Sequence, residues 1–431
     1  MGSGRLNLPS ATVFSADQLG LSRSQISRAA LTVLKGLHKH GYDSYLVGGC
    51  VRDLLLGVEP KDFDVVTNAG PEEIRDIFRS ARIIGRRFRL VHVRFGREII
   101  EVATYRGHPG NQLTEDGRLL SDNVYGTRDE DAARRDLPVN AMYYDPTSGD
   151  VLDYHDAMSD IKAGVLRTIG DPHTRFREDP VRMLRVVRFS AKLGFQVEGQ
   201  VAAAISELAG LISDVPPARL FEEVLKLFHS GSAVTTFERL RQYNLFEQLF
   251  PATNDVLATL DHEFPRTFLP QALDNTDKRI ATGKPVIPAF LFAVLLWEPY
   301  YRQQSEYTQQ GVGEYESIHM AANVVIEEQV RTVAVPKRFT AQVREIWEMQ
   351  YFFDKQRKRQ VYRLLENRKF RAGYDFLLLR ASIGQASSDC ADWWTALQEQ
   401  DEAGKREMIN QLAGGKARRH KRRRPRKKAA N

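Results

Sequence analysis

The most informative part of the chain reads Leu46-Val47-Gly48-Gly49-Cys50-Val51-Arg52-Asp53-Leu54-Leu55-Leu56-Gly57 and, after a short gap, Lys61-Asp62-Phe63-Asp64-Val65-Val66-Thr67. Residues 45–47 are predicted to form a short apolar strand and residues 51–56 a short helix, with Gly48 and Gly49 as the turn between them. Backbone N–H groups in a turn without side chains can approach phosphate oxygens closely, and the positive end of the following helix favours negative charge. This turn is therefore a candidate binding site for a triphosphate.

The second half of this stretch carries two acids, Asp62 and Asp64. Residues 61–67 are predicted to form a strand. Because the side chains of a strand alternate between its faces, the two acids point to one face while Phe63 and Val65 point to the other. Two carboxylates on one face can hold Mg²⁺, so the sequence predicts a metal site beside the phosphate-binding turn.

The length and composition of the chain limit its class. With 431 residues it is too long for a single hydrophobic core and suggests roughly two to three domains. The longest apolar run, residues 289–297, is too short to cross a bilayer, and the N-terminus does not have the pattern of a signal peptide. The two cysteines, Cys50 and Cys390, lack metal-binding spacing, so neither a disulfide framework nor a zinc site is indicated. We expect a cytoplasmic protein with reduced thiols.

The positive charge is concentrated at the C-terminus. Residues 416–431 hold ten Lys or Arg residues and no acid, and removing these ten charges from the net charge of +7 leaves the rest of the chain at −3. Such a segment cannot bury enough apolar surface to fold, so we expect a disordered tail. Release of counterions from a polyanion would drive its binding, which favours nucleic acid as its partner over a role in solubility alone.

The pattern of the chain changes near residue 165. Before it, residues 24–40 have an amphipathic helical pattern, and short strands are predicted at residues 82–84, 90–95 and 99–104. After it, the apolar spacing is helical, at residues 179–193, 217–229, 289–297, 315–331, 342–353 and 359–365. These patterns predict a compact mixed α/β domain followed by helical domains.

Two residues are candidates for the third acid that a two-metal site needs. Glu101 lies on a predicted strand, from which it can project beside the two aspartates; in a purely structural role it would pair with an arginine such as Arg106. Asp136 lies in the string Arg134-Arg135-Asp136-Leu137-Pro138-Val139-Asn140. The residues alone leave this choice open.

A predicted helix carries closely spaced charges in the string Arg177-Glu178-Asp179-Pro180-Val181-Arg182-Met183-Leu184-Arg185-Val186-Val187-Arg188-Phe189. Pro180 suits the first turn of a helix, and the acids suit its N-terminus. A spacing of three residues makes Asp179 a neighbour of Arg182, and Arg182 a neighbour of Arg185, on the helix surface. An acid beside an arginine can read the edge of a nucleobase.

The glycine turn followed by D-x-D on the next strand resembles the nucleotidyltransferase superfamily of DNA polymerase beta. The longer form LVGGCVRDLLLG…KDFDVVT is more similar to its bacterial branch, which contains poly(A) polymerase and the tRNA CCA-adding enzyme. Arg135 and Asp136 match the RRD motif of that branch, which is associated with the sugar and phosphates of the nucleotide; Leu137 replaces the usual aromatic. Asp179 and Arg182 match its E-D-x-x-R nucleotide-selection motif. On this resemblance we favour Asp136 as functional, with its role open between metal and ribose.

The resemblance implies an α+β fold: a small polymerase-beta-like nucleotidyltransferase head with a mixed sheet, an all-helical neck, body and leg region, and a disordered basic tail. The expected divisions are a flexible N-terminus at residues 1–23, the catalytic head at 24–165, a helical neck with the nucleotide-selection and RNA-binding region at 166–235, a helical body with a C-terminal RNA-binding region at 236–412, and the tail at 413–431.

One segment separates the members of this branch. Residues 83–93 contain Gly85-Arg86-Arg87-Phe88-Arg89, which resembles the G-R-R-F-R signature of bacterial poly(A) polymerases and is usually lacking in CCA-adding enzymes. Its three arginines can hold phosphates or an RNA end.

These motifs imply an RNA 3′-end adenylyltransferase that adds AMP from ATP to an RNA 3′-hydroxyl, releases pyrophosphate and repeats without a template, with Mg²⁺ as cofactor. The implied roles are catalysis for Asp62, Asp64 and Asp136, with the metal held by Asp62 and Asp64 and with Glu101 as the alternative third carboxylate; nucleotide binding for Gly48, Gly49, Arg52, Arg135, Asp179, Arg182 and Arg185; and RNA binding for Arg86, Arg87, Arg89, Arg418, Arg419, Arg422, Arg423 and Arg424.

The implied partners are ATP, the 3′ ends of mRNA and small RNAs, and RNA-decay proteins, and we expect a monomer. Two alternative functions stay open. A CCA-adding tRNA nucleotidyltransferase would use CTP and stop after three nucleotides. A catalytically inactive RNA-binding adaptor would bind RNA without extending it, and the intact acids argue against it.

Overall fold

The computed structural model describes residues 10–85, 89–107, 124–260 and 268–412. The chain divides into two compact units, Met1–Leu249 and Phe250–Asn431. The predicted head and neck both belong to the first unit, and the finer divisions after residues 165 and 235 stay predictions. The expected basic tail lies outside the described residues.

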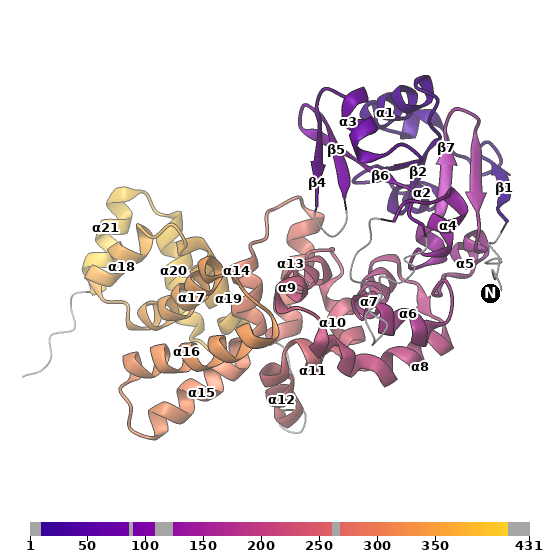
Figure 1. Ribbon diagram of the computed structural model, residues 1–431. Coiled ribbons are helices and arrows are strands. Elements are labelled where there is room, and N and C mark those ends of the chain that lie inside the picture. Colours follow the sequence, from indigo (N-terminus) through magenta and orange to yellow (C-terminus); the bar gives the residue numbers. More distant parts are fainter. Residues whose placement is uncertain (1–9, 86–88, 108–123, 261–267, 413–431) are drawn as a thin grey trace, which may run out of the picture. The chain divides into compact units, whose positions relative to one another are not determined.

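A mixed eight-stranded sheet forms the head of the first unit (Figure 1), with the strand order β1-β8-β7-β2-β3-β6-β5-β4. The neighbours β3 and β6 run parallel, and the other neighbouring strands are antiparallel. The strands are β1 (Thr12–Ser15), β2 (Ser44–Val47), β3 (Asp64–Thr67), β4 (Ala81–Ile84), β5 (Leu90–Phe95), β6 (Glu98–Thr104), β7 (Met142–Asp145) and β8 (Asp150–Asp153); a second, parallel pair joins β9 (Val165–Leu166) and β10 (Gln196–Val197). This arrangement confirms the predicted mixed sheet.

Helices complete the first unit. They are α1 (Arg28–Lys39), α2 (Gly49–Leu55), α3 (Pro71–Ile77), α4 (Arg128–Ala133), α5 (Ala157–Ala163), α6 (Pro172–Glu178), α7 (Val181–Leu193), α8 (Gly199–Leu208), α9 (Pro217–Phe228), α10 (Ala233–Gln242) and α11 (Leu245–Leu249), with the short 3-10 turns η1 (Arg23–Gln25), η2 (Pro138–Asn140) and η3 (Ala209–Asp214).

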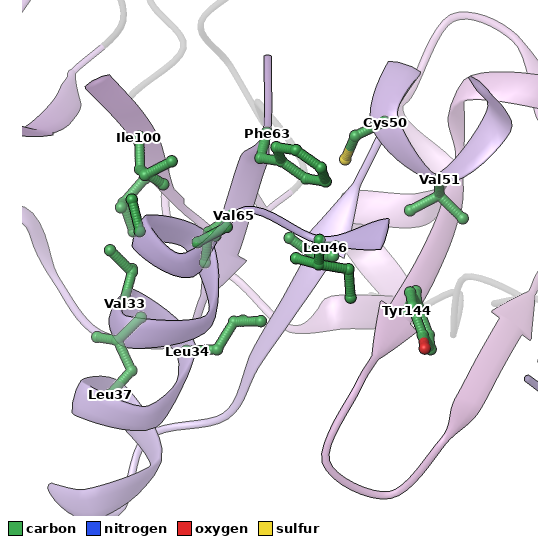
Figure 2. Close-up of a cluster of buried hydrophobic side chains, with 14 of the residues drawn as sticks. Val33, Leu34, Leu37, Leu46, Cys50, Val51, Phe63, Val65, Ile100 and Tyr144 are labelled. Atoms are coloured by element: carbon green, nitrogen blue, oxygen red, sulfur yellow. The ribbon is translucent and has the colours of Figure 1, made fainter. Parts of the chain in front are cut away.

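The main core of the head lies between the sheet and α1. The Ser27 hydroxyl accepts a hydrogen bond from the backbone N–H of Ala30 at 3.0 Å, which caps this helix. The apolar stripe of α1 then packs on side chains from β2, β3 and β6, as Figure 2 shows for Val33, Leu34, Leu37, Leu46, Val65 and Ile100. Alternation places the intervening strand residues in a second cluster, which contains Val47, Val66 and Tyr143. Burial on both faces fixes the register of the central strands.

Within its described residues, the regular secondary structure of the second unit is entirely helical. Its helices are α12 (Pro251–Leu260), α13 (Phe268–Ala281), α14 (Pro288–Leu295), α15 (Trp297–Gln309), α16 (Glu314–Thr332), α17 (Lys337–Lys355), α18 (Lys358–Leu365), α19 (Phe370–Ser382), α20 (Ser388–Glu399) and α21 (Glu402–Gln411). Within residues 10–412, apart from the gaps given above, no helix is long and apolar enough to cross a membrane.

Two predicted elements have different boundaries. The strand predicted at residues 61–67 begins only at Asp64, because Asp64 pairs with Val47 and the next residue of β2 would be Gly48, where the chain turns away. The helix predicted from residue 179 begins at Val181, and Asp179 instead ends α6 in an extended conformation. A residue that precedes a proline is disfavoured in the helical region, which explains this break at Pro180.

Substituting Gly36 by Ala is expected to lower the thermal midpoint of unfolding. A Cβ at this position of α1 would lie 2.7 Å from two ring atoms of Phe78. Such overpacking typically costs about 1–3 kcal/mol, against which Ala regains up to about 1 kcal/mol of helix propensity. Gly199→Ala is the matched control, because nothing lies within 4 Å of its Cβ position. Equal thermal midpoints for the two variants would contradict the close packing of Phe78 on α1.

Candidate active site

The glycine turn lies directly against an acidic side chain. Gly48 has φ 80° and ψ −135° and immediately precedes α2. A Cβ at Gly48 would lie 3.9 Å from Oδ2 of Asp64, and the positive φ is itself unfavourable for other residues. The glycine turn and Asp64, the first residue of β3, therefore belong to one site.

Two carboxylates from parallel strands stand side by side in this site. Asp64 of β3 is in register with Glu101 of β6, and His92 of β5 is in register with Glu101 from the other side. The Nε2 atom of His92 lies 3.2 Å from Oε1 of Glu101. Glu101 thus faces Asp64 and His92 rather than the arginine that a structural role would require.

The environment of Asp64 disfavours its negative charge. Burial raises the pKa of its carboxyl, Glu101 raises it further, Arg135 offsets part of the rise, and Asp62 adds to it; the resulting pKa is about 6 instead of 3.8. Among the described residues, no side chain donates a hydrogen bond to the Asp64 carboxylate. An acid that is partly buried, faces a second acid and has no such donor is a good ligand for a cation.

Asp62 lies just before β3 and is exposed, while Phe63 is buried in the main core. Its charge reaches Asp64, since it contributes to the raised pKa of that carboxyl. The two predicted acids are thus brought together, although Asp62 is not part of the strand.

Asp136 has a different environment. Nε of Arg185 donates to its Oδ2 at 2.6 Å, and the backbone N–H of Leu137 donates to its Oδ1 at 2.9 Å. Burial alone would raise the pKa of Asp136, but Arg185, the Leu137 N–H and Arg182 together outweigh burial and the net pKa is lowered. The register of β3 and β6 brings Glu101 next to Asp64, whereas Asp136 is held by Arg185 of α7.

Arg52 is buried beneath the turn, with an exposed fraction of 1%. Its Nε donates to Oδ1 of Asp53 at 2.8 Å, and its Nη1 donates to Oδ1 of Asn140 at 2.5 Å. A Cβ at Gly49 would lie 3.4 Å from Nη2 of Arg52. The guanidinium thus supports the turn from below, and Asp53 and Asn140 hold it in place.

Arg135 is held in a similar network. Its guanidinium donates to Oδ2 of Asp131 at 2.9 and 3.0 Å and to the Tyr143 hydroxyl at 3.0 Å. The Tyr143 hydroxyl also donates to Asp131 at 2.7 Å. Arg135 is near enough to Asp64 to lower its pKa, so it is a fixed positive charge beside the carboxylates.

The predicted base-reading pair does not interact through its side chains. Arg182 Nη1 donates to Oε2 of Glu178 at 2.6 Å, whereas both oxygens of Asp179 accept from Arg219 of α9 at 2.9 and 2.7 Å. Arg175 of α6 also donates to the backbone carbonyls of residues 134 and 135 at 2.6 and 2.7 Å. These contacts join α6, α7 and α9 to the segment that carries Arg135 and Asp136.

Sequence reasoning missed the partners that fix these residues. Arg219, Asn140 and Arg175 act through contacts over long sequence separations. Asp131, in contrast, lies four residues before Arg135, a spacing that is visible in the sequence. The sequence signal closest to these four residues was polarity, because each of them lies within or next to a charged string.

Of the arginines predicted to bind RNA, the described one is Arg89. Its Nη2 donates to Oε1 of Glu72 at 2.6 Å, and both side chains are substantially exposed. Arg86, Arg87 and the tail residues Arg418, Arg419, Arg422, Arg423 and Arg424 lie outside the described residues.

The carboxylates suit Mg²⁺ better than a metal that needs a full protein cage. Over the described ranges, no group of three or more His, Cys, Asp or Glu side chains has the geometry to hold a metal ion. Mg²⁺ is commonly bound through one or two carboxylates, with substrate phosphates completing its shell. Asp62 and Asp64, with Glu101 in register beside Asp64 and the glycine turn at 48–49 in contact with it, fit that requirement.

Three family models match the chain. They are described as the poly A polymerase head domain (residues 44–167), the probable RNA and SrmB-binding site of polymerase A (194–257) and the polymerase A arginine-rich C-terminus (310–428). Together they cover most of the described residues and part of the tail.

Similar proteins agree with these matches. Poly(A) polymerase I of Salmonella typhi is 44% identical over 432 residues, covering 98% of this chain and 93% of that protein. Poly(A) polymerase I of Haemophilus influenzae is 45% identical, covering 93% and 90%. The CCA-adding enzyme of Bacillus pumilus is 34% identical and covers 55% of this chain and 58% of that protein. In fold, the chain is similar to a solved structure of a tRNA-processing enzyme in an apo form, with a TM-score of 0.59, 22% identity and coverage of 88% and 99%.

Replacing Asp64 by Asn is expected to stabilise the metal-free protein near neutral pH. In the folded chain the Asp64 carboxyl keeps its proton up to a pH of about 6, whereas the ordinary pKa is 3.8. The free energy of unfolding therefore falls as the pH rises from 3.8 to about 6, and the full loss of stability is present above pH 6. Asn carries no charge, so Asp64→Asn should gain roughly 1–3 kcal/mol at pH 7.5 and nothing near pH 4.

Thermal unfolding in the presence of a chelator, from pH 4 to pH 8, measures this effect. Glu59→Gln is the matched control, because Glu59 is an exposed acid between α2 and β3 and should show no such gain. A midpoint for Asp64→Asn at or below that of the wild type at pH 7.5 would show that the Asp64 charge is not destabilising.

Proposed function

Because the chain belongs to the bacterial poly(A) polymerase family, we propose that it is a template-independent polynucleotide adenylyltransferase, which adds AMP from ATP to RNA 3′-hydroxyl ends and releases pyrophosphate. The observation that carries this proposal in the structure is the Asp64 carboxylate. It lies against the glycine turn, in register with Glu101, and has no hydrogen-bond donor among the described side chains.

Asp62 and Asp64 are assigned as the residues that hold Mg²⁺, and Glu101 is the candidate third carboxylate. The register of β3 and β6 supports Glu101 for this place, whereas the ion pair with Arg185 leaves Asp136 better suited to the ribose of the nucleotide. When bound, Mg²⁺ supplies charge neutralisation at the triphosphate and at the attacking oxygen.

The turn at Gly48 and Gly49 is assigned to the triphosphate. The lack of side chains there lets phosphate oxygens come close to the backbone. Arg52 supports the turn, held by Asp53 and Asn140, and would supply positive charge to phosphates bound at the turn. Arg135 supplies a second fixed positive charge near the carboxylates. A preorganised arrangement of this kind needs little rearrangement when charge develops during transfer.

Asp179 and Arg182 are assigned to bind the base of ATP. Their contacts with the base would select the nucleotide without a template. Each is engaged with another residue: Asp179 with Arg219 and Arg182 with Glu178. Reading the edge of adenine therefore requires each side chain to share or exchange such a contact, and Arg219 becomes a positioning residue for Asp179.

RNA is the expected primer, held mainly through phosphates. Contacts are assigned to Arg86, Arg87 and Arg89, to the basic residues between Lys355 and Arg371, and to the tail arginines from Arg418 to Arg424. The family model over residues 194–257 describes a probable RNA and SrmB-binding site, so this helical region is a candidate surface for both. We further assign the protein to the cytoplasm, as a monomer that acts in RNA turnover beside RNA-decay proteins.

The alternative functions are less well supported. The CCA-adding enzyme of Bacillus pumilus matches about half of the chain at 34% identity, whereas the two poly(A) polymerases match nearly all of it at 44% and 45%. A catalytically inactive RNA-binding adaptor would not need Asp62 and Asp64 beside the glycine turn.

Nucleotide use and product length test the proposal. With Mg²⁺ and a generic RNA, ATP alone should give a long ladder of products, and CTP, GTP or UTP alone should give little extension. A tRNA without its terminal CCA should also be extended past three nucleotides when ATP is supplied. Products that stop after C, C and A on that tRNA, when all four nucleotides are present, would assign the chain to CCA addition instead.

The double variant Asp62→Ala, Asp64→Ala provides the control for chemistry. It should lose incorporation by roughly a thousandfold or more, because the metal contributes several kcal/mol to transition-state stabilisation. Its affinity for RNA should persist. Glu59→Ala removes an exposed acid of the same unit and should leave incorporation unchanged. Undiminished incorporation by the double variant would overturn the assignment of the two acids.

Deleting residues 416–431 should weaken RNA binding and reduce its dependence on salt. The segment carries ten positive charges, and each lost phosphate contact lowers the slope of log affinity against log salt concentration by roughly 0.7 for single strands. Titrations at several salt concentrations measure both quantities. A tail of equal length with Gln in place of each Lys and Arg is the control for length alone. An unchanged affinity and slope would exclude the tail as an RNA contact.

A further inference from the structure

A cavity of about 510 Å³ lies in the second unit and shares no residue with the site in the head. It is bounded by residues of α15, α16 and α17 and by Arg380 of α19. We call it the aromatic pocket and define it by Trp297, Tyr300, Tyr301, Trp347, Tyr351 and Arg380. Its volume falls within the range of about 300–1,000 Å³ that is typical of small-molecule sites.

The aromatic side chains of this pocket form ordered stacks. Tyr300 and Trp347 stack with ring centroids 4.2 Å apart and an angle of 15° between the rings, and Trp297 and Tyr301 stack at 5.6 Å and 30°. Tyr301, at the outer end of its stack, is 39% exposed, whereas the other three are almost completely buried. The Tyr301 ring is therefore available to a ligand and is supported by the Trp297 ring behind it.

The indole N–H groups are already satisfied. Trp297 Nε1 donates to Oε1 of Gln385 at 2.7 Å, and Trp347 Nε1 donates to the carbonyl of Ala293 at 3.1 Å. These tryptophans thus contribute ring surface rather than donors. The polar groups of the pocket come from other side chains.

Arg380 supplies the buried polar group. It is 6% exposed, its guanidinium lies over the Trp297 ring at 5.4 Å, and Nη1 and Nη2 donate to Oε1 of Gln350 at 3.3 Å and to the carbonyl of Gln385 at 3.0 Å. Its Nε is buried without a hydrogen-bond partner among the described residues. An unsatisfied buried donor costs free energy, which a ligand acceptor would recover.

The charge of the lining disfavours a phosphate inside the pocket. Glu314 and Asp354 both line it, against the single positive charge of Arg380. Gln304, Ser305 and Thr308 add neutral donors and acceptors. A flat, neutral heterocycle that has both donors and acceptors on its edges fits this combination of rings and polar groups.

Positive charge instead begins at the rim. Asp354 is followed in sequence by a basic segment that contains Lys355, Arg357, Lys358 and Arg359. Lys355 pairs with Glu314 at 2.7 Å and lies over the Tyr351 ring at 5.1 Å. A neutral aromatic pocket beside a basic surface is the arrangement by which proteins stack bases of a single strand while contacting its phosphates. This juxtaposition favours RNA over a peptide as the ligand.

We propose that the aromatic pocket binds an adenine base of single-stranded RNA, with Tyr301 stacking on the base, Arg380 donating to a ring nitrogen and the basic residues after Asp354 contacting the flanking phosphates. The choice of adenine rests on the proposed function, because the product of the reaction is an adenosine tail. The pocket would hold adenylated RNA at a place separate from the catalytic carboxylates.

Binding of short oligoadenylate and oligouridylate to the full-length protein, measured by fluorescence anisotropy with a chelator present to prevent extension, tests this proposal. Tyr301→Ala should weaken oligoadenylate binding about 5- to 100-fold, since stacking on an aromatic side chain contributes roughly this much per base. Oligouridylate binding should change much less. Tyr362→Ala is the matched control, because Tyr362 is 37% exposed within the same basic region on α18 but does not line the pocket.

A second variant, Thr308→Trp, fills the pocket from its exposed rim and keeps Tyr301, so it tests the same site if Tyr301→Ala fails to fold. It should weaken oligoadenylate binding to a similar extent. Unchanged oligoadenylate binding in both folded variants would overturn the proposal and leave a peptide as the better ligand. Equal losses for oligoadenylate and oligouridylate would overturn the choice of adenine.

The proposed adenylyltransferase function and the proposed adenine-binding pocket can be refuted independently of each other. Incorporation of AMP by the wild type depends on the head, and both pocket variants should retain it on a short primer at saturating concentration. A wild type that adds no AMP would refute the proposed function, while the ratio of oligoadenylate to oligouridylate affinities would still report on the pocket.

Discussion

The close approach of the Gly48 backbone to the Asp64 carboxylate is the constraint on which the head depends. Val47 pairs with Asp64, and the chain leaves β2 one residue later at Gly48, whose positive φ is unfavourable for a residue with a side chain. The parallel register of β3 and β6 then sets Glu101 beside Asp64. The turn and the two facing acids are thus positioned by the registers of three neighbouring strands.

A second layer of contacts makes this geometry rigid. Arg52 lies beneath the turn, between Asp53 and Asn140, and Arg135 is held by Asp131 and Tyr143. Each guanidinium is satisfied by protein groups, so its position is set before any nucleotide arrives. Such buried networks are strong only when complete, because a missing partner leaves a charge without compensation. The positive charges of the site are therefore fixed by the fold rather than by the substrate.

The sequence predicted those features that depend on neighbours along the chain. The glycine turn, the alternation around Phe63 and Asp64, and the stripe on α1 follow from local spacing, and the structure has all three. It could not predict which acid would face Asp64, because the register of Glu101 depends on two strands separated by α3 and a hairpin. For the same reason, the spacing of Asp179 and Arg182 suggested that the two side chains pair, whereas in the structure Asp179 forms its ion pair with Arg219 on α9. The break at Pro180 was available from the sequence, since a residue before proline rarely continues a helix.

The raised pKa of Asp64 has a consequence for engineering this protein. Folding and function make opposite demands on that one side chain, because the charge that attracts a cation is unfavourable in the chain without it. A screen that selects only for resistance to heat, in the absence of divalent cations, would reward neutral residues at this position. It would enrich heat-resistant variants that have lost catalytic activity, and this loss would be detected only when turnover was assayed. Directed evolution of this scaffold therefore needs selection for heat resistance and for turnover in the same round.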